Sequence, residues 1–236
     1  RVQFLRHIIY HKGKGQEIPM KEKWISSIMA GIYIAMGAMV YLSISDKLAA
    51  SLFFATGILL VLNLHNRLFT RVCPLFAYNG SYRPGDLFIA WIGNGIGTAL
   101  VAILIHFTRF EAGILGRIEE IVIPKLADSP VSLTILGLFC ALFVAFAVFV
   151  GGIRQKQGTF AQIFYVWLFI TAFVFCGFEH IIADMYYLSV YVLNFGTSIG
   201  DVLKVLLFVT LGNVIGGIAA GYFVQNLERE SHENRK

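Results

Sequence analysis

Long apolar runs dominate the chain and are separated by short polar stretches. A helix that spans a membrane needs about 20 predominantly apolar residues. Two runs are interrupted near their middle, and four reach this length without interruption: Trp24–Ile44, Leu87–Phe107, Val131–Ile153 and Val202–Leu227. The pattern therefore predicts an all-α polytopic membrane protein with six transmembrane segments, of which the second and the fifth are broken.

The two interrupted runs have a similar layout. Ala49–Leu64 is followed by the polar stretch HNRLFTR (65–71) before apolar residues resume. Phe160–Cys176 is followed by GFEH (177–180), and the apolar run then resumes as far as Phe195. A backbone break at membrane depth is tolerated where it is buried in protein or lines a cavity. We therefore expect both breaks to lie close to a substrate path.

Composition and charge agree with a membrane protein. Hydrophobic residues make up 57% of the chain and charged residues only 14%, whereas soluble domains have about 25% charged residues. Lysines and arginines lie in short connections rather than in one patch, so we expect no nucleic-acid partner. Fourteen of them fall on one side of the predicted membrane and four on the other, which predicts that both termini are cytoplasmic.

Similar motifs recur half a chain apart. IGNGIG (92–97) lies in the third segment, and LGNVIG (211–216) lies 119 residues later in the sixth. Residues 24–227 are therefore predicted to form one six-helix channel domain built from two repeats, about 24–107 and 131–227. Each repeat has three spans, so the second is inverted, which is typical of transport proteins with a substrate site near the midplane. Residues 1–23 are expected to form a cytoplasmic extension, as an amphipathic helix at the membrane surface, and residues 228–236 a cytoplasmic tail.

The recurring motifs combine glycines with an asparagine. Glycines four residues apart usually permit close packing of helices, and we interpret these pairs in that way. The amides of Asn94 and Asn213 lie at membrane depth and need hydrogen-bond partners. A loop backbone or a buried histidine would serve.

Three ionisable side chains, Glu179, His180 and Asp184, lie within six residues of an otherwise apolar segment. Each costs about 2.5 kcal/mol or more at the bilayer centre, so we expect tight pairing or a water-filled path. One interpretation is that Glu179 and His180 simply satisfy loop amides where the backbone unwinds. The other is that His180 faces the permeation path, because it can donate and accept hydrogen bonds and titrates near neutral pH.

The sequence motifs do not favour an enzyme. His180 and Asp184 are four residues apart and His65 lies in the other break, but catalytic zinc usually has three protein ligands. The sequence lacks HExxH, GxSxG, P-loop and Rossmann motifs. We therefore expect no enzymatic activity, no metal and no cofactor, with a membrane metalloenzyme as an alternative.

Taken together, the motifs resemble the formate/nitrite transporter family, which also includes hydrosulfide channels. GFEHIIADMY (177–186) is similar to the family's GFEHSxANMF, and LFT (68–70) to the motif in its broken second helix. The GN pairs at 93–94 and 212–213 resemble its paired motifs, and the resemblance runs from about Lys23 to Gln225. It implies an aquaporin-like fold with one pore per protomer, a homopentamer in the lipid bilayer, and a location in the bacterial cytoplasmic membrane.

The resemblance also implies roles for individual residues. His180 would be the central pore histidine, with Thr70 on the opposing loop and Asn213 as a hydrogen-bond partner. Lys125 would draw anions into the extracellular vestibule. The pore and substrate-binding set implied in this way is His180, Thr70, Lys125, Asn213, Glu179 and Asn94. One constriction would be lined by Leu68, Phe69 and Val144, and the other by Phe54, Ile58 and Phe173.

The chain departs from the family pattern at Ile181, Asp184, Ala141 and Arg71, and these departures slightly favour hydrosulfide. The expected function is a channel or transporter for small monovalent anions, with hydrosulfide, formate and nitrite as the candidates. The alternative is an aquaporin-like channel for neutral solutes, but its two NPA motifs are absent from the sequence.

Overall fold

Four helices of the computed structural model are long and apolar enough to cross a membrane. They are α2 (Met20–Ser43), α5 (Pro84–His106), α8 (Pro130–Val148) and α11 (Ile199–Glu233). The structure describes residues 18–150 and 159–233, and within these ranges all regular elements are helices. Each of the four covers most of one of the uninterrupted apolar runs, so the predicted all-α membrane architecture is confirmed.

The second and fifth apolar segments are each split into two helices. α3 (Lys47–Asn63) and α4 (Phe69–Asn79) are separated by residues 64–68, which we call the first break. α9 (Thr159–Cys176) and α10 (Ile181–Phe195) are separated by residues 177–180, the second break. α9 and α10 together are apolar enough for one span and bend by 50° at their break. The interruptions predicted from the polar stretches are therefore confirmed.

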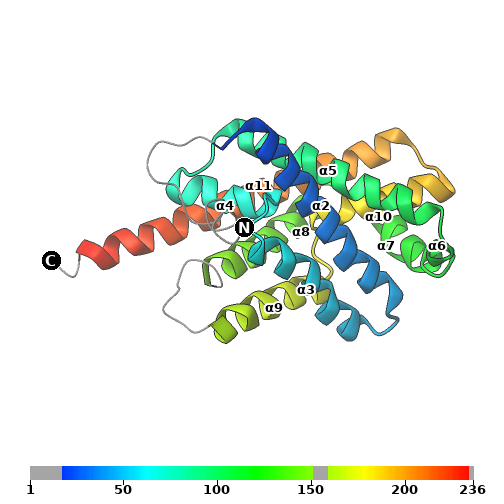
Figure 1. Cartoon of the computed structure of the whole chain (residues 1–236), viewed down its shortest axis with the longest axis horizontal. Coiled ribbons are helices and arrows are strands. Elements are labelled where there is room, and N and C mark those ends of the chain that lie inside the picture. Colours follow the sequence, from blue (N-terminus) through cyan, green and yellow to red (C-terminus); the bar gives the residue numbers. More distant parts are fainter. Residues whose placement is uncertain (1–17, 151–158, 234–236) are drawn as a thin grey trace.

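The connection between the two halves contains two helices that the apolar pattern does not predict. α6 (Arg109–Ala112) and α7 (Leu115–Ala127) follow α5, and in Figure 1 they lie at the end of the molecule opposite the C-terminus. α7 carries Lys125 in its last turn. The helix matters for function because it brings this lysine to the second break.

The short helix of each half packs mainly against a long helix of the other half. α2 packs along α5 and α8 along α11, which gives each half its main helix pair. α4, from the first half, packs mainly against α11, whereas α10, from the second half, packs mainly against α5. In Figure 1, α4 and α10 accordingly lie toward opposite ends of the molecule. This crossed arrangement is the one expected of two inverted repeats.

The repeated glycines lie where the main helix pairs come closest. A Cβ atom on Gly97 of α5 would lie 2.2 Å from the carbonyl oxygen of Ile28 on α2. One on Gly216 of α11 would lie 2.3 Å from the carbonyl oxygen of Leu138 on α8. A side chain would force the helices apart at both places, so the packing interpretation of these glycines is confirmed.

One hydrogen bond joins matching positions of the two repeats. Trp91 Nε1 on α5 donates to Thr210 Oγ1 on α11 at 3.0 Å. The two residues are 119 positions apart, the same separation as the two GN motifs. A contact between equivalent positions lies on the axis that relates the halves, so this pseudo-twofold axis passes between α5 and α11.

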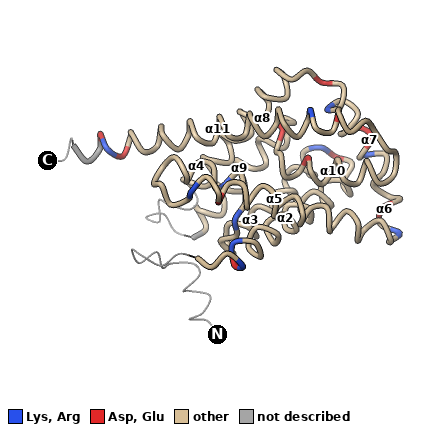
Figure 2. Tube along the Cα trace, turned by 90° about the horizontal axis from the view of Figure 1, so that it is seen from above, with Lys and Arg blue, Asp and Glu red and all other residues tan. Residues whose placement is uncertain are grey.

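Large apolar side chains cover much of the outer surface. Phe88, Phe107 and Phe160 are exposed by 65%, 80% and 83%. Long stretches of the chain carry no charge in Figure 2, and the charged residues gather mostly near helix ends. Such a surface is suited to contact with lipid or with another subunit.

Some expectations concern residues outside the described ranges. These are the predicted extension up to residue 17, the basic connection with Arg154 and Lys156, and residues 234–236 of the tail. Where the ends of the channel domain are described, α2 begins at Met20 and α11 continues to Glu233. Both helices therefore extend beyond the predicted limits at 24 and 227.

Candidate functional site

The two breaks meet where α4 and α10 begin. Thr70 is the second residue of α4, and His180 is the residue just before α10. Thr70 Oγ1 and His180 Nε2 are 2.9 Å apart, and both side chains are buried. The fold thus brings together two residues 110 positions apart in the chain for which the resemblance implies pore roles.

Asn94 of α5 holds the first break in place. Its side-chain oxygen accepts a hydrogen bond from the backbone N–H of Phe69, the first residue of α4, at 2.8 Å. Its side-chain nitrogen donates to the carbonyl oxygens of Arg67 at 2.9 Å and of Ser27 at 2.7 Å. One amide therefore ties the break to both α5 and α2.

Asn213 of α11 holds the second break with the same three bonds. Its oxygen accepts from the N–H of Ile181, the first residue of α10, at 3.0 Å. Its nitrogen donates to the carbonyl oxygens of Glu179 at 2.9 Å and of Gly137 on α8 at 2.8 Å. Of the two kinds of partner expected for these amides, the structure shows the loop backbone. Asn213 therefore positions His180 through the backbone on either side of it.

His180 also caps the helix that follows it. Its Nδ1 accepts a hydrogen bond from the backbone N–H of Ala183 at 3.2 Å, which satisfies one of the free donors at the start of α10. An imidazole nitrogen that accepts carries no proton, so the proton of the neutral ring lies on Nε2. Nε2 then donates to Thr70 Oγ1, and the threonine hydroxyl keeps its own proton to donate.

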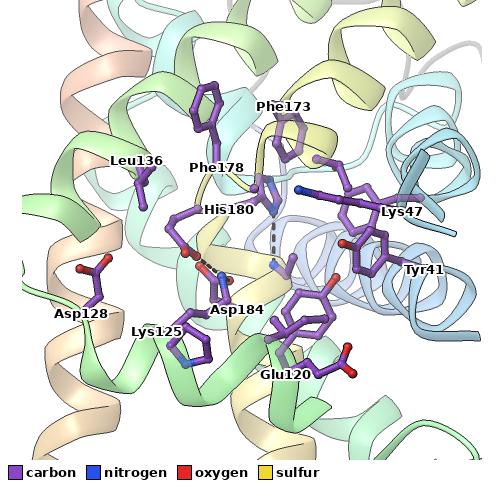
Figure 3. Close-up of a pocket in the computed structure, with 18 residues that line it drawn as sticks. Tyr41, Lys47, Glu120, Lys125, Asp128, Leu136, Phe173, Phe178, His180 and Asp184 are labelled. Atoms are coloured by element: carbon purple, nitrogen blue, oxygen red, sulfur yellow. Dashed lines mark hydrogen bonds and ion pairs between the residues drawn. The ribbon is translucent and has the colours of Figure 1, made fainter. Parts of the chain in front are cut away.

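A pocket of about 480 Å³ opens beside His180 (Figure 3). Phe173 of α9 stacks on the histidine ring, with ring centroids 5.8 Å apart, and Phe54 of α3 meets Phe173 edge-on at 6.2 Å. Both phenylalanines line the pocket, together with Lys125, Glu179 and Asp184. The wall thus changes from aromatic near the histidine to charged near α7.

The six residues that the resemblance assigns to two constrictions are all buried. Phe54 and Phe173 are in ring contact, and Leu68 and Phe69 flank Thr70 at the start of α4. The exposed fractions are 3% or less for the whole set, which is Leu68, Phe69, Val144, Phe54, Ile58 and Phe173. The histidine–threonine contact therefore lies within apolar surroundings.

Lys125 is paired with two carboxylates. Its Nζ donates to Glu179 Oε2 in the second break and lies 3.0 Å from Asp184 Oδ1 in the first turn of α10. Burial alone would lower the pKa of Lys125, but the carboxylates of Asp184 and Glu179 outweigh it and raise that pKa, so the lysine stays charged. The tight pairing expected for the ionisable residues is confirmed, and we call Lys125, Glu179 and Asp184 the second-break cluster.

The first break has a charge cluster that the sequence reasoning missed. Asp86 Oδ1, near the start of α5, lies 2.9 Å from Arg67 Nη1 and 2.7 Å from Lys23 Nζ. Asp86 Oδ2 accepts from the backbone N–H of Arg83, the residue that precedes α5. Asp86 stands just before an apolar run. A carboxylate in this position stabilises the N-terminus of a helix, so the sequence does contain a signal that could have identified Asp86. We call Lys23, Arg67 and Asp86 the first-break cluster.

Tyr41, Lys47 and Tyr187 also line the pocket and were not expected there. They lie on α2, α3 and α10, and no motif distinguishes them in the sequence. In the part of the chain that the structure describes, no group of three or more His, Cys, Asp or Glu side chains is arranged to hold a metal ion.

Comparison with known proteins identifies the family. The sequence model described as formate/nitrite transporter matches residues 3–225. The nitrite transporter NirC of Salmonella typhimurium strain LT2 is 27% identical over 220 residues, which cover 83% of this chain and 78% of NirC. YwcJ of Bacillus subtilis strain 168, an uncharacterized transporter, is 30% identical over 219 residues, which cover 82% of this chain and 84% of YwcJ.

Solved structures share the fold. An FNT family ion channel has a TM-score of 0.72 at 25% identity, over 83% of this chain and 85% of that chain. A pentameric formate channel with formate bound has a TM-score of 0.74 at 21% identity, over 90% and 97%. The match to the family model covers both breaks and both asparagine motifs. The chain is therefore a multi-pass membrane protein that belongs to the formate/nitrite transporter family.

Proposed function

We propose that the protein carries small monovalent anions of weak acids across the membrane, with nitrite, formate and hydrosulfide as the candidates. Its named relatives include the nitrite transporter NirC and the formate channel FocA of Haemophilus influenzae, which is 24% identical over 249 residues. Hydrosulfide stays among the candidates because Ile181 and Asp184 depart from the family motif. The proposed function has no catalytic step.

The observation that carries this proposal is the meeting of two helix N-termini at the Thr70–His180 contact. Each N-terminus carries a partial positive charge of roughly half an elementary charge, and Asn94, Asn213 and His180 accept hydrogen bonds from some of the N–H groups at these ends. Thr70 is uncharged, and His180 is neutral while its Nδ1 caps α10. An anion at this point would be stabilised by two helix dipoles without a fixed cation.

The apolar surroundings favour weak acids over permanent anions. Leu68 and Phe69 on one side and Phe54 and Phe173 on the other supply little that could replace the water around a bare ion. Burying an isolated charge without such replacement is very costly. Nitrite, formate and hydrosulfide can avoid this cost because each becomes a small neutral molecule when it takes up a proton.

Location and assembly complete the proposal. The distribution of lysine and arginine supports a protein of the bacterial cytoplasmic membrane with both termini in the cytoplasm, which puts the Lys125 side of the pocket outside. The exposed apolar surface is compatible with a homopentamer with one pore in each subunit. Lys125 then lies in the extracellular vestibule, and His180 and Thr70 lie at the centre of the pore.

The test is anion uptake into proteoliposomes. Nitrite, formate, hydrosulfide and chloride are offered at two pH values to the wild type and to His180→Phe and His180→Asn. Phenylalanine fills the space of the ring but cannot cap α10, whereas asparagine is a good N-cap residue and keeps that bond. His106→Phe is the control, because His106 is the last residue of α5 and its side chain pairs with Glu111 instead of Thr70.

We expect selective uptake of at least one weak-acid anion by the wild type and by His106→Phe, and loss of it in both His180 variants. Equal uptake by His180→Asn and the wild type would remove the histidine ring from the mechanism. Water flux without any anion uptake, in protein that remains folded, would replace the proposal with a channel for neutral solutes.

A further inference from the structure

A buried cluster with unequal charges borders the pocket on the side away from the aromatic wall. The side chains of Lys125, Glu179 and Asp184 are exposed by only 12%, 7% and 2%. Lys125 comes from the last turn of α7, Glu179 from the second break and Asp184 from the first turn of α10 (Figure 3). Three separate elements therefore converge on one ammonium group.

The cluster has one cation for two carboxyl groups. If both were ionised, an excess negative charge would be buried, which is expensive at this depth. Two carboxyl groups that share a site avoid the cost by holding one proton between them. Asp184 Oδ2 is buried and has no hydrogen-bond partner among the described residues, so it is available to carry that proton.

The groups around the cluster do not balance the charge. Of the charged residues that line the same pocket, Lys47 is a cation, and Glu120 and Asp128 are carboxylates. Lys47 is also engaged with the Phe175 ring, 5.3 Å from its centroid. The remaining titratable groups that face the cluster from adjoining elements are Tyr41, Cys140, His180, Tyr187 and, from α11 beside α7, Lys204. Lys204 donates to the Leu126 carbonyl oxygen, so it does not reach the two carboxyl groups.

His180 is poorly placed to supply a proton. A second proton would have to sit on Nδ1, which accepts the Ala183 N–H, so protonation would break the cap of α10. The positive ends of α4 and α10 also disfavour an imidazolium at this point. A proton for the anion must therefore come from elsewhere in the pocket.

We propose that Glu179 and Asp184 hold one shared proton beside Lys125 and transfer it to the anion as it enters the pocket. This inference rests on the proposed function. The carboxylic O–H bond breaks, its electron pair stays on the carboxylate, and a new O–H bond forms on nitrite or formate, or an S–H bond on hydrosulfide. The neutral acid passes His180, and a hydronium ion from the solvent at the open side of the pocket returns a proton to the pair and becomes water.

Asp184 is the residue that creates this site. With the asparagine of the family motif at this position, Lys125 and Glu179 would form a balanced pair with no excess charge. The aspartate adds one negative charge, and hence one exchangeable proton, without adding bulk. Asp184→Asn is therefore a nearly isosteric test, and Glu119→Gln on α7, outside the pocket lining, is its matched control.

The first measurement is the infrared absorption of protonated carboxyl groups in purified protein at pH 7, compared between the wild type and the two variants. We expect a carboxylic acid band in the wild type and in Glu119→Gln that is lost in Asp184→Asn. Identical spectra in the wild type and Asp184→Asn would overturn the shared proton. This arm does not depend on transport.

The second measurement is the number of protons consumed for each anion taken up into proteoliposomes at a clamped membrane potential. We expect one proton per anion in the wild type and in Glu119→Gln. In Asp184→Asn we expect the ratio to fall toward zero and uptake to become sensitive to the potential. An unchanged ratio in Asp184→Asn would overturn the transfer step. A wild type that takes up no anion but shows the infrared band would reject the proposed function and leave the shared proton intact.

Discussion

The two breaks are held by the same clamp but differ in their balance of basic and acidic side chains. Asn94 and Asn213 each bind the first N–H of a short helix, a carbonyl two residues before it, and a carbonyl on the neighbouring long helix. The first-break cluster has two cations and one carboxylate. The second-break cluster has one cation and two carboxyl groups.

The residue before each short helix also differs. Leu68 precedes α4 and makes no side-chain cap, whereas His180 precedes α10 and caps it. The bonds that hold the backbone are therefore duplicated, while the two polar side chains in contact, Thr70 and His180, have apolar residues, Ile182 and Leu68, at the matching positions of the other break. This division predicts which substitutions harm the fold in both halves and which harm transport in one.

The largest effect is expected from Asn94→Ala and Asn213→Ala. Each change leaves one N–H and two carbonyl groups without their partner, and an unsatisfied buried group costs about 1–3 kcal/mol. Because the bonds are the same, we expect similar losses in the resistance of the detergent-solubilised protein to heat. A large loss at one position and none at the other would refute the shared clamp.

The two charge clusters predict opposite weak points. Asp86→Asn leaves Lys23 beside Arg67, and Lys125→Met leaves Glu179 beside Asp184, so each removes the central ion and should cost about 3–5 kcal/mol. Thermal unfolding of the two variants measures both effects.

The control for this prediction removes an outer residue, which is one of the two residues of like charge in each cluster, and keeps the central ion. Arg67→Met leaves a balanced Lys23–Asp86 pair, and Glu179→Gln leaves a balanced Lys125–Asp184 pair. Both should be much milder than the central substitutions. Equal losses from central and outer changes would mean that packing, rather than charge balance, determines stability here.

Thr70→Val should affect transport more than folding. It leaves the Nε2–H of His180 without its acceptor at a cost of about 1–3 kcal/mol, and it removes the hydroxyl from the proposed anion site. Thr70→Ser should restore both properties, as measured by anion uptake. Ile182 is the second residue of α10 and so matches Thr70. Ile182→Val should cost about 0.5–1.5 kcal/mol without changing selectivity, and a selectivity change there would contradict the one-sided arrangement.

A small effect on stability is expected where the second break turns. Gly177 has a φ of +75°, and a Cβ on it would meet nothing within 4 Å. Gly177→Ala should therefore cost about 1–2 kcal/mol from backbone conformation alone. Gly177→Asn should cost less, since asparagine tolerates this region. The first break turns at His65 with a φ of +54°, so a side chain is compatible with such a turn, and complete unfolding of Gly177→Ala would be unexpected.

Much of the fold could be predicted because apolar length is a strong local signal. The spans, the two breaks and the paired asparagine motifs all follow from runs and repeats within short stretches of sequence. α7 could not be predicted in this way, because it is short and only partly apolar.

The sequence indicated which residues form the site but not which side chains pair with one another. His180, Thr70 and the two asparagines carry recognisable motifs, and the structure brings them together. The pairing of Lys125 with Asp184 depends on how α7 and α10 pack, which no local pattern encodes. The same holds for Asp86 and Lys23, which lie on different helices.

The Trp91–Thr210 hydrogen bond has a consequence for ancestry. In two identical halves, a residue on the shared axis would face its own copy in the other half. Two tryptophans in this position would offer two hydrogen-bond donors and no acceptor. Two threonines could bond to each other, but an indole requires a different residue across the axis. In two halves that descend from one duplicated unit, this bond could form only after the copies had diverged at that position.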